Sequence, residues 1–176
     1  MNDKVKIRMG TIEDAFAISE VHAQSKRAAY RGLASELALT SISGEERLPL
    51  WQKVLTNAAL ETLVAHVSED LAGFALLGPS NDPDCSPTAT MEIHALYVSP
   101  GQWRRGLGRT LMAEAAARGV QLSYSEVCVW TALPDARQFY ESIGFVHDGS
   151  ERVSPLMKGS GIEVTDVRYR KCLRAL

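Results

Sequence analysis

The chain has 176 residues, of which 45% are hydrophobic and 23% charged, and its formal net charge is −2. A chain of this length buries about 70% of its extended-chain surface, so we expect one globular domain over residues 1–176. The charge excludes a global basic surface for nucleic acid, and no stretch approaches the 18 or so apolar residues of a membrane span.

The number and spacing of the cysteines and histidines limit the possible disulfides and metal sites. Cys85, Cys128 and Cys172 are odd in number and lack Cys-x-x-Cys spacing, which argues against a disulfide framework or a zinc site. The four histidines are too scattered to suggest a metal cluster. The N-terminal residues lack the apolar core of a secretion signal. We therefore expect a cytoplasmic protein without a metal, a membrane partner or a nucleic-acid partner.

The first half of the chain predicts a strand, two helices and a hairpin. Thr11 is a candidate N-cap, and Ser43 opens a candidate capping box. Pro49 is expected to limit the second helix to an irregular first turn. The predicted elements are a strand over residues 5–9, a helix from Thr11 to about Ala29, a helix from Ser43 towards Asn57, and paired strands over 62–67 and 71–77.

The second half predicts two further helices between strands. Gly144 is expected to end the last helix through its tolerance of left-handed backbone. The elements are an exposed loop over 80–87, a strand over 88–98, a helix ending near Arg118 and Gly119, a strand over 126–130, a helix from Pro134, and antiparallel strands over 145–152 and 163–171. This order predicts an α+β fold.

A basic turn containing glycine follows the strand that ends at Val98. The start of a helix exposes N–H groups without an intrahelical acceptor, and its dipole favours negative charge. Glycine lets a ligand approach the backbone, and arginine supplies charge for phosphate oxygens. The turn holds Gly106 and Gly108 among Arg104, Arg105 and Arg109. The pattern predicts a phosphate or pyrophosphate site.

The alternative is a tight connection whose arginines form a solvated first helical turn. Cations at a helix start oppose the dipole, and an anionic ligand would relieve that conflict. The turn matches neither the third glycine of the dinucleotide motif nor the Gly-Lys-Ser/Thr of a P-loop. Spacing alone leaves both interpretations open.

About thirty residues after this turn, residues 139–145 read Phe-Tyr-Glu-Ser-Ile-Gly-Phe. Together the two segments resemble the GCN5-related N-acetyltransferase superfamily, whose signature is Phe-Tyr-Glu-x-x-Gly-Phe. The resemblance covers the whole chain, including residues 7–14 and 167–171. It implies a central, mostly antiparallel, V-splayed sheet of about seven strands, flanked by about four helices, with acetyl-coenzyme A held in the splay.

The resemblance also assigns the cofactor contacts. The amides of Leu96, Tyr97 and Val98 would pair with the pantetheine arm, and that of Val98 would donate to the thioester oxygen. The amides from Arg104 through Arg105, Gly106, Leu107 and Gly108 to Arg109 would cradle the pyrophosphate. Two positions depart from the family pattern: Trp103 replaces Gln or Arg, and Leu133 replaces an asparagine.

Acyl transfer to an amine needs a base for the amine and an acid for the departing thiolate. Glu92 matches a family base, with a solvent-facing strand glutamate as the alternative. Tyr140 matches the tyrosine beside the coenzyme sulfur, with a core tyrosine as the alternative. On a regular strand His94 would share the face of Glu92 and could be a second base, although a structural role is commoner. Cys128 is better explained as a small buried hydrophobe than as a nucleophile.

The acceptor is poorly specified by the sequence. In the family the first two helices and their connection form one wall of the acceptor cleft. Tyr30, Arg31 and Trp51 lie there and could fix a carboxylate and an apolar group of a small amino acid or amine. The alternative is that Tyr30 and Trp51 cover the core while Arg31 faces water. Asp82 and Asp84 could attract a cationic acceptor or could simply belong to a mobile loop.

Three functions compete at this stage. The first is an acetyl-CoA-dependent N-acetyltransferase acting on the primary amine of a small metabolite or amino acid. The second acetylates a protein lysine or N-terminus, and the third is a non-catalytic coenzyme A-binding sensor. A homodimer is compatible with the resemblance, since dimers are common in the family.

Overall fold

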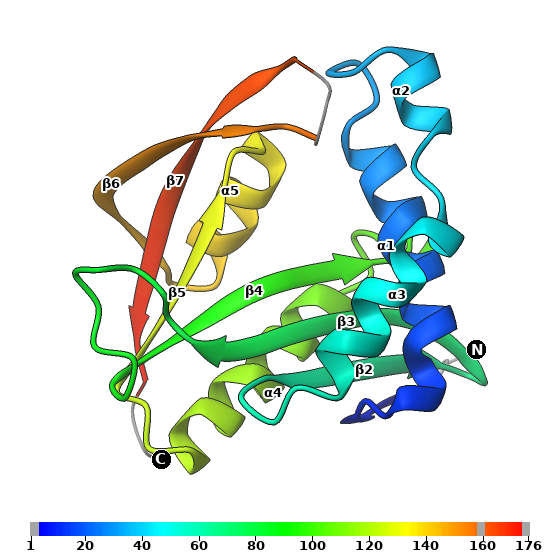
Figure 1. Cartoon of the computed structure of the whole chain (residues 1–176). Coiled ribbons are helices and arrows are strands. Elements are labelled where there is room, and N and C mark those ends of the chain that lie inside the picture. The colour runs from blue at the N-terminus through cyan, green and yellow to red at the C-terminus, as the bar shows by residue number, and fades with distance from the viewer. Residues whose placement is uncertain (1–3, 158–160, 174–176) are drawn as a thin grey trace. The chain divides into compact units, whose positions relative to one another are not determined.

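The computed structural model describes residues 4–157 and 161–173, and Figure 1 labels most of its helices and strands. The strands are β1 (Val5–Met9), β2 (Glu61–Val67), β3 (Asp70–Pro79), β4 (Thr90–Val98), β5 (Glu126–Thr131), β6 (Val146–Pro155) and β7 (Glu163–Cys172). The helices are α1 (Ala15–Ala29), α2 (Glu36–Thr40), α3 (Gly44–Leu55), α4 (Leu107–Gln121) and α5 (Pro134–Ser142), with 3₁₀ turns η1 (Ile12–Asp14) and η2 (Pro100–Gln102).

The strands form one seven-stranded sheet in the order β1-β2-β3-β4-β5-β7-β6. Thr90 to Glu92 of β4 pair in parallel with Glu126 to Cys128 of β5, whereas β1–β2, β2–β3, β5–β7 and β6–β7 are antiparallel. The predicted α+β fold with a mostly antiparallel sheet of about seven strands is therefore confirmed.

The differences from the predicted elements are local. The described residues contain five α-helices rather than about four, because the five-residue α2 was not predicted. Its N-cap is Ser35, whose hydroxyl accepts a hydrogen bond from the amide of Ala38 at 3.2 Å. The predicted irregularity at Pro49 is wrong: α3 runs through this residue from Gly44. The helical backbone is therefore kept at Pro49 although proline lacks the N–H that would donate within the helix.

The chain divides into two compact units, each made of two segments. The first unit comprises Met1–Gly78 and His94–Ala117, and the second comprises Pro79–Ile93 and Arg118–Leu176. The prediction of a single domain over residues 1–176 stays a prediction. Within the described residues, no helix is both long enough and apolar enough to cross a membrane.

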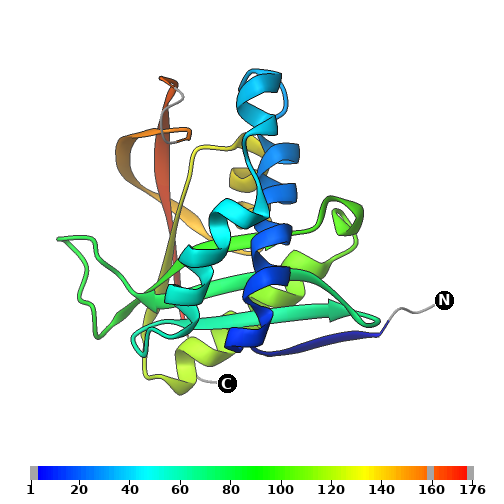
Figure 2. The same cartoon turned by 45° about the vertical axis from the view of Figure 1, so that its right-hand side comes forward.

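In the first unit, α1 and α3 lie side by side on one face of the strands (Figure 2). Ile18, Trp51, Val64 and Phe74 form the centre of that layer and are at most 2% exposed. Successive residues of a strand face opposite sides. Gly73, next to Phe74, therefore faces the other side, where a Cβ would lie 3.2 Å from Leu111 of α4. The helices thus cover both faces of this unit.

A buried histidine sits in this core. The indole of Trp51 donates to Nδ1 of His22 at 3.1 Å, and the His22 side chain packs edge-on against Trp51 and Phe74. Burial, together with smaller effects of the positive charges of Arg47 and Lys26, lowers the pKa of His22 to about 3. His22 is therefore neutral in the native protein at physiological pH.

Acidification should destabilise the protein through His22. The unfolded chain binds a proton on this residue below pH ~6.5, whereas the native state does not until about pH 3. Stability should then fall by about 1.4 kcal/mol per pH unit below 6.5, or about 2 kcal/mol by pH 5. Urea unfolding at pH 7, 6 and 5 should show this slope in the parent and lose it in His22→Gln. The exposed His147→Gln should keep the slope, and equal slopes in all three proteins would contradict the assignment.

Candidate active site

The turn before α4 has the backbone conformation that close approach of a ligand requires. Gly106 has a φ of +87°, and Arg104 has a φ of +61°, a left-handed conformation uncommon for a residue with a side chain. Nothing lies within 4 Å of the position that a Cβ would take on Gly106. The turn is exposed and leads directly into Leu107, the first residue of α4. It therefore presents open backbone at the start of a helix of 15 residues.

The peptide N–H groups at this helix start remain available. Gln102 and Trp103 donate to the carbonyls of Ser99 and Pro100 within η2. By contrast, within residues 4–157 and 161–173 the amides of Gly106, Leu107 and Gly108 donate to no protein acceptor. First-turn amides have no partner inside a helix, so these groups can donate hydrogen bonds to water or to an anion.

Trp103, which departs from the family pattern, has a definite structural role. Its indole N–H donates to the carbonyl of Val98 at 2.6 Å, and the hydroxyl of Ser25 donates to the same oxygen at 2.8 Å. The two bonds tie the turn and α1 to the end of β4. Sequence reasoning did not select Ser25, because the contact joins residues 73 positions apart.

The direction of the peptide groups at the end of β4 can be read from their neighbours on β3. The amide of Ser99 donates to the carbonyl of Ala72, and the carbonyl of Tyr97 lies 2.9 Å from the position of a Cβ on Gly73. In a trans peptide the C=O and the following N–H point in opposite directions, and no cis peptide is present in the described residues. The Tyr97 carbonyl faces β3, so the N–H of Val98 faces away from β3.

The three predicted pantetheine contacts therefore separate into two groups. The N–H and C=O of one strand residue point to the same side, and this side alternates along the strand. Leu96 shares the side of Val98, whereas the amide of Tyr97 is directed to β3. The backbone favours Leu96 and Val98 as the amides that face a ligand, and it does not favour Tyr97.

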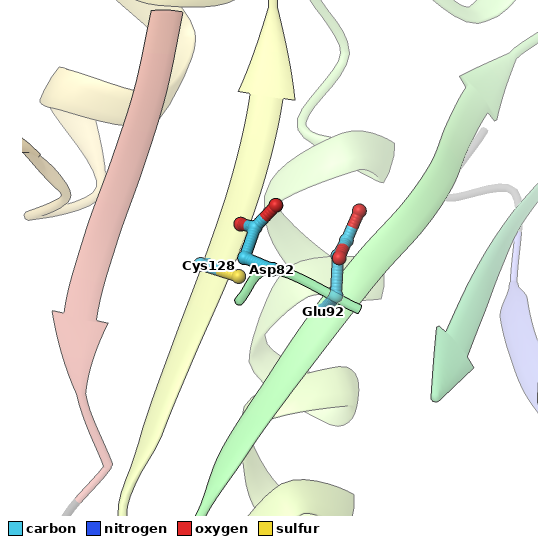
Figure 3. Close-up of side chains that lie close together, drawn as sticks. All are labelled: Asp82, Glu92 and Cys128. Atoms are coloured by element: carbon cyan, nitrogen blue, oxygen red, sulfur yellow. The ribbon is translucent and has the colours of Figure 1, made fainter. Parts of the chain in front are cut away.

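In the second unit, Glu92 lies in a buried polar cluster rather than on a solvent-facing surface. Its side chain is 8% exposed and accepts a hydrogen bond from the hydroxyl of Ser80 at 3.3 Å. Figure 3 shows the carboxylates of Glu92 and Asp82 beside the thiol of Cys128. One ligand atom of each residue lies within 4.8 Å of the others. The burial of Glu92 therefore disfavours the alternative of a solvent-facing strand glutamate.

The donor set of this cluster disfavours a metal ion. Burial raises the pKa of Cys128 to about 12, with a smaller opposing effect of the Ser80 hydroxyl. At this pKa the Cys128 side chain stays a neutral thiol at physiological pH. One oxygen of Asp82 already accepts hydrogen bonds from Trp130 and Arg168, each at 2.9 Å. Cys128 therefore fits the interpretation of a small buried side chain.

Asp82 and Asp84 do not form a free acidic patch. Arg168, 3% exposed, donates to Asp82 at 2.9 Å, to both oxygens of Asp84 at 2.7 and 2.5 Å, and to Asp148 at 2.7 Å. Hydrogen bonding to Arg168 lowers the pKa of Asp84 to about 2. The loop over residues 80–87 is thereby anchored to β7, and both of its carboxylates are paired with Arg168.

Tyr140 lies in the aromatic core of the second unit. Its side chain is 5% exposed, and its ring centre is 5.2 Å from Phe139, 5.5 Å from Phe145 and 6.4 Å from Tyr169. Gly144 ends α5 at a φ of +86°, as predicted, and the amide of Phe145 donates to the carbonyl of Tyr140 at 3.1 Å. The ring is thus rigidly held, which suits either a core role or a positioned catalytic hydroxyl.

The predicted acceptor residues occupy three different environments. Trp51 is 2% exposed in the core, which favours the alternative in which it covers the core. Arg31 is exposed, and Tyr30 caps the end of α1, half-buried, with the ammonium of Lys26 5.3 Å from its ring centre.

Comparison with known proteins assigns this arrangement to a family. Residues 27–145, more than half of the chain, match the model of the acetyltransferase (GNAT) family. The chain is similar to the uncharacterized N-acetyltransferase YuaI of Bacillus subtilis, with 28% identity over 127 residues that cover 72% of this chain and 70% of YuaI.

Solved structures share the fold. PaiA N-acetyltransferase from Thermoplasma acidophilum, in complex with coenzyme A, aligns with a TM-score of 0.73 and 24% identity over 96% of this chain and 99% of PaiA. YncA from Salmonella typhimurium, with its cofactor acetyl-CoA, aligns with a TM-score of 0.69 and 19% identity over 98% and 96% of the two chains. The chain therefore belongs to the GNAT family of acetyltransferases.

Proposed function

We propose that this protein transfers an acetyl group directly from acetyl-CoA to the primary amine of a small metabolite or amino acid. The observation that carries the proposal is that the amides of Gly106, Leu107 and Gly108 at the start of α4 donate to no acceptor within the described part of the chain. These groups suit a pyrophosphate, and PaiA and YncA were solved with coenzyme A and acetyl-CoA. The cysteines of the described residues form no disulfide, which fits action in the cytoplasm.

Each proposed residue has one task. The amides from Arg104 to Arg109 hold the pyrophosphate, and the outward N–H groups of Leu96 and Val98 bind the arm of the cofactor. Acetyl-CoA supplies an activated acyl group, and the N–H of Val98 stabilises the charge that develops on its carbonyl oxygen. Glu92 accepts the proton that the amine must lose, through water. Tyr140 donates a proton to the departing thiolate, because a phenol with a reference pKa near 10 still carries its proton at neutral pH.

Thiol release tests the proposal against the other two functions. The purified chain is incubated with acetyl-CoA and either a panel of small amines or lysine-containing peptides. Release that depends on a small amine supports the proposal, whereas release only with peptides favours a protein acetyltransferase. Tight binding of acetyl-CoA without release from any acceptor would reject acetyl transfer in favour of a sensor.

Tyr140→Phe should lower kcat at least tenfold while leaving the acetyl-CoA Kd within about twofold, since a general acid typically contributes about 10²–10⁴-fold. The substitution removes one oxygen and keeps the ring contacts with Phe145 and Tyr169. Steady-state kinetics and calorimetry measure the two quantities. Tyr124→Phe, outside the proposed site, should match the parent. Equal rates for Tyr140→Phe and the parent would leave Tyr140 with a structural role only.

A further inference from the structure

A cationic group of side chains lies where α1 packs along α3 in the first unit. We call Lys26 of α1 and Arg47 of α3 the α1–α3 cation pair. His22, Lys26 and Tyr30 recur every four residues and share one face of α1. His22 contacts Trp51, which lies one turn after Arg47 on α3. The two cations are therefore brought to the same helix–helix seam.

This pair has no acidic partner among the described residues. Neither Lys26 nor Arg47 forms an ion pair with a carboxylate in residues 4–157 or 161–173. The Nε of Arg47 is buried and has no hydrogen-bond partner among the residues that the structure describes. A buried guanidinium N–H without an acceptor is costly, so an acceptor from outside the protein would stabilise it.

The groups around the α1–α3 cation pair make its positive charge more costly to bury. Burial lowers the pKa of Lys26, and the nearby positive charge of Arg47 lowers it further. His22 stays neutral at physiological pH and therefore does not offset the positive charge of the pair. Tyr30 and Tyr97 add phenol groups, with Lys26 5.3 Å from the ring centre of Tyr30. The seam is thus positive and aromatic, which matches an anionic ligand group.

The seam adjoins the end of β4. His22 stacks on Tyr97 with ring centres 4.5 Å apart, and the hydroxyl of Ser25 donates to the carbonyl of Val98 at 2.8 Å. Both contacts lie within the first unit. The residue proposed to bind the thioester oxygen, Val98, is therefore a neighbour of the helix face that carries Lys26.

We propose that the α1–α3 cation pair binds the carboxylate of the acceptor, so that the substrate class is a primary amine that also carries a carboxylate. The inference rests on the proposed acetyl transfer and deepens it. Arginine suits this task because its planar fork pairs with a carboxylate through two hydrogen bonds. In this proposal the α1–α3 cation pair, rather than Arg31 or Trp51, selects the acceptor, since Arg31 is exposed and Trp51 lies in the core.

Matched acceptors test the proposal directly. Amino acids and the amines that remain after removal of their carboxyl group are compared pairwise, for example lysine with cadaverine and phenylalanine with phenethylamine. The parent should favour the amino acid at least tenfold in kcat/KM. Arg47→Gln and Lys26→Gln should each raise the KM for the amino acid at least tenfold and leave the KM for acetyl-CoA within twofold. Lys53→Gln, which removes an exposed cation from α3, should match the parent.

The outcomes separate this inference from the proposed function. Equal use of amino acid and amine, or an unchanged KM in both variants, would overturn it. If no acceptor is acetylated, calorimetry with the coenzyme A-loaded protein decides the question. Amino-acid binding that weakens in both variants would support the cation pair while rejecting acetyl transfer, and absence of binding would overturn the cation pair as well.

Discussion

Gly106→Glu should abolish binding of acetyl-CoA, with a loss in affinity of at least about 100-fold by calorimetry. The substitution places a carboxylate among the amides of Gly106, Leu107 and Gly108, where the pyrophosphate would accept hydrogen bonds. Loss of two charge-assisted hydrogen bonds costs about 3 kcal/mol or more, which corresponds to this factor. Like-charge repulsion adds to the loss. The fold should persist, because the turn is exposed and nothing lies within 4 Å of a Cβ there.

Backbone strain must be separated from the electrostatic effect. A side chain at the φ of +87° costs about 1–2 kcal/mol by itself. Gly149 has a φ of +91° and equally open surroundings, so Gly149→Glu carries the same strain without a proposed phosphate contact. It should bind acetyl-CoA like the parent. Gly106→Ala introduces strain without charge and should weaken binding less than Gly106→Glu. Unchanged affinity in Gly106→Glu would refute the placement of the pyrophosphate.

The features that could be predicted from the sequence depend on local signals. The glycine turn at Gly106, the capping box at Ser43 and the end of α5 at Gly144 are each set by residues within one helical turn. The structure gives Gly106 and Gly144 positive φ values, and the hydroxyl of Ser43 accepts from the amide of Glu46 at 3.2 Å. Such backbone requirements act over three or four residues, so the sequence reveals them directly.

The features that could not be predicted depend on pairing between distant segments. The peptide group of Tyr97 faces β3, whereas those of Leu96 and Val98 face away from it. A shift of β4 by one residue would reverse this pattern. The burial of Glu92 follows from contacts with Ser80 and Cys128. No pattern within ten residues of Glu92 encodes these contacts. The α1–α3 cation pair likewise needs the packing of two helices to become visible.

The same limit applies to the acidic loop. Its sequence permits a mobile loop or an attractor for cations, whereas in the structure Asp82 and Asp84 both accept hydrogen bonds from Arg168, 86 and 84 residues away in sequence. Only the tertiary fold identifies their partner. Their pairing with Arg168 predicts a contribution to stability, which the next prediction tests.

Arg168→Met should destabilise the protein by about 3–5 kcal/mol, the cost of breaking a buried ion network by removing one partner. Arg168 is 3% exposed, and its guanidinium also donates to the hydroxyl of Ser150 at 2.8 Å. The variant leaves Asp82 and Asp148, only 12% and 18% exposed, without their main cation. For a chain of this size the melting temperature should fall by about 10 °C, measured by calorimetry.

Two matched variants isolate the buried network. Arg152→Met removes a cation from β6 that is 48% exposed and 3.6 Å from Asp166, so it should cost less than about 1 kcal/mol. Arg168→Lys retains the charge but loses the planar fork, and its stability should lie between that of the parent and that of Arg168→Met. Equal stability of Arg168→Met and Arg152→Met would contradict a structural role for the network.

Acidic pH supplies a second signature of the Arg168 network. Arg168 holds the pKa of Asp84 at about 2, and hydrogen bonds from Ser150 and Arg168 outweigh the opposing effect of burial to lower the pKa of Asp148. Native-state pKa values below the unfolded values stabilise the fold above pH ~4, and this stabilisation is lost as the pH falls towards 2. The stability gap between the parent and Arg168→Met should therefore narrow below pH 4. The titration of His22 affects both proteins equally and cancels in the difference, so a gap that stays constant from pH 7 to pH 2.5 would show that these carboxylates do not depend on Arg168.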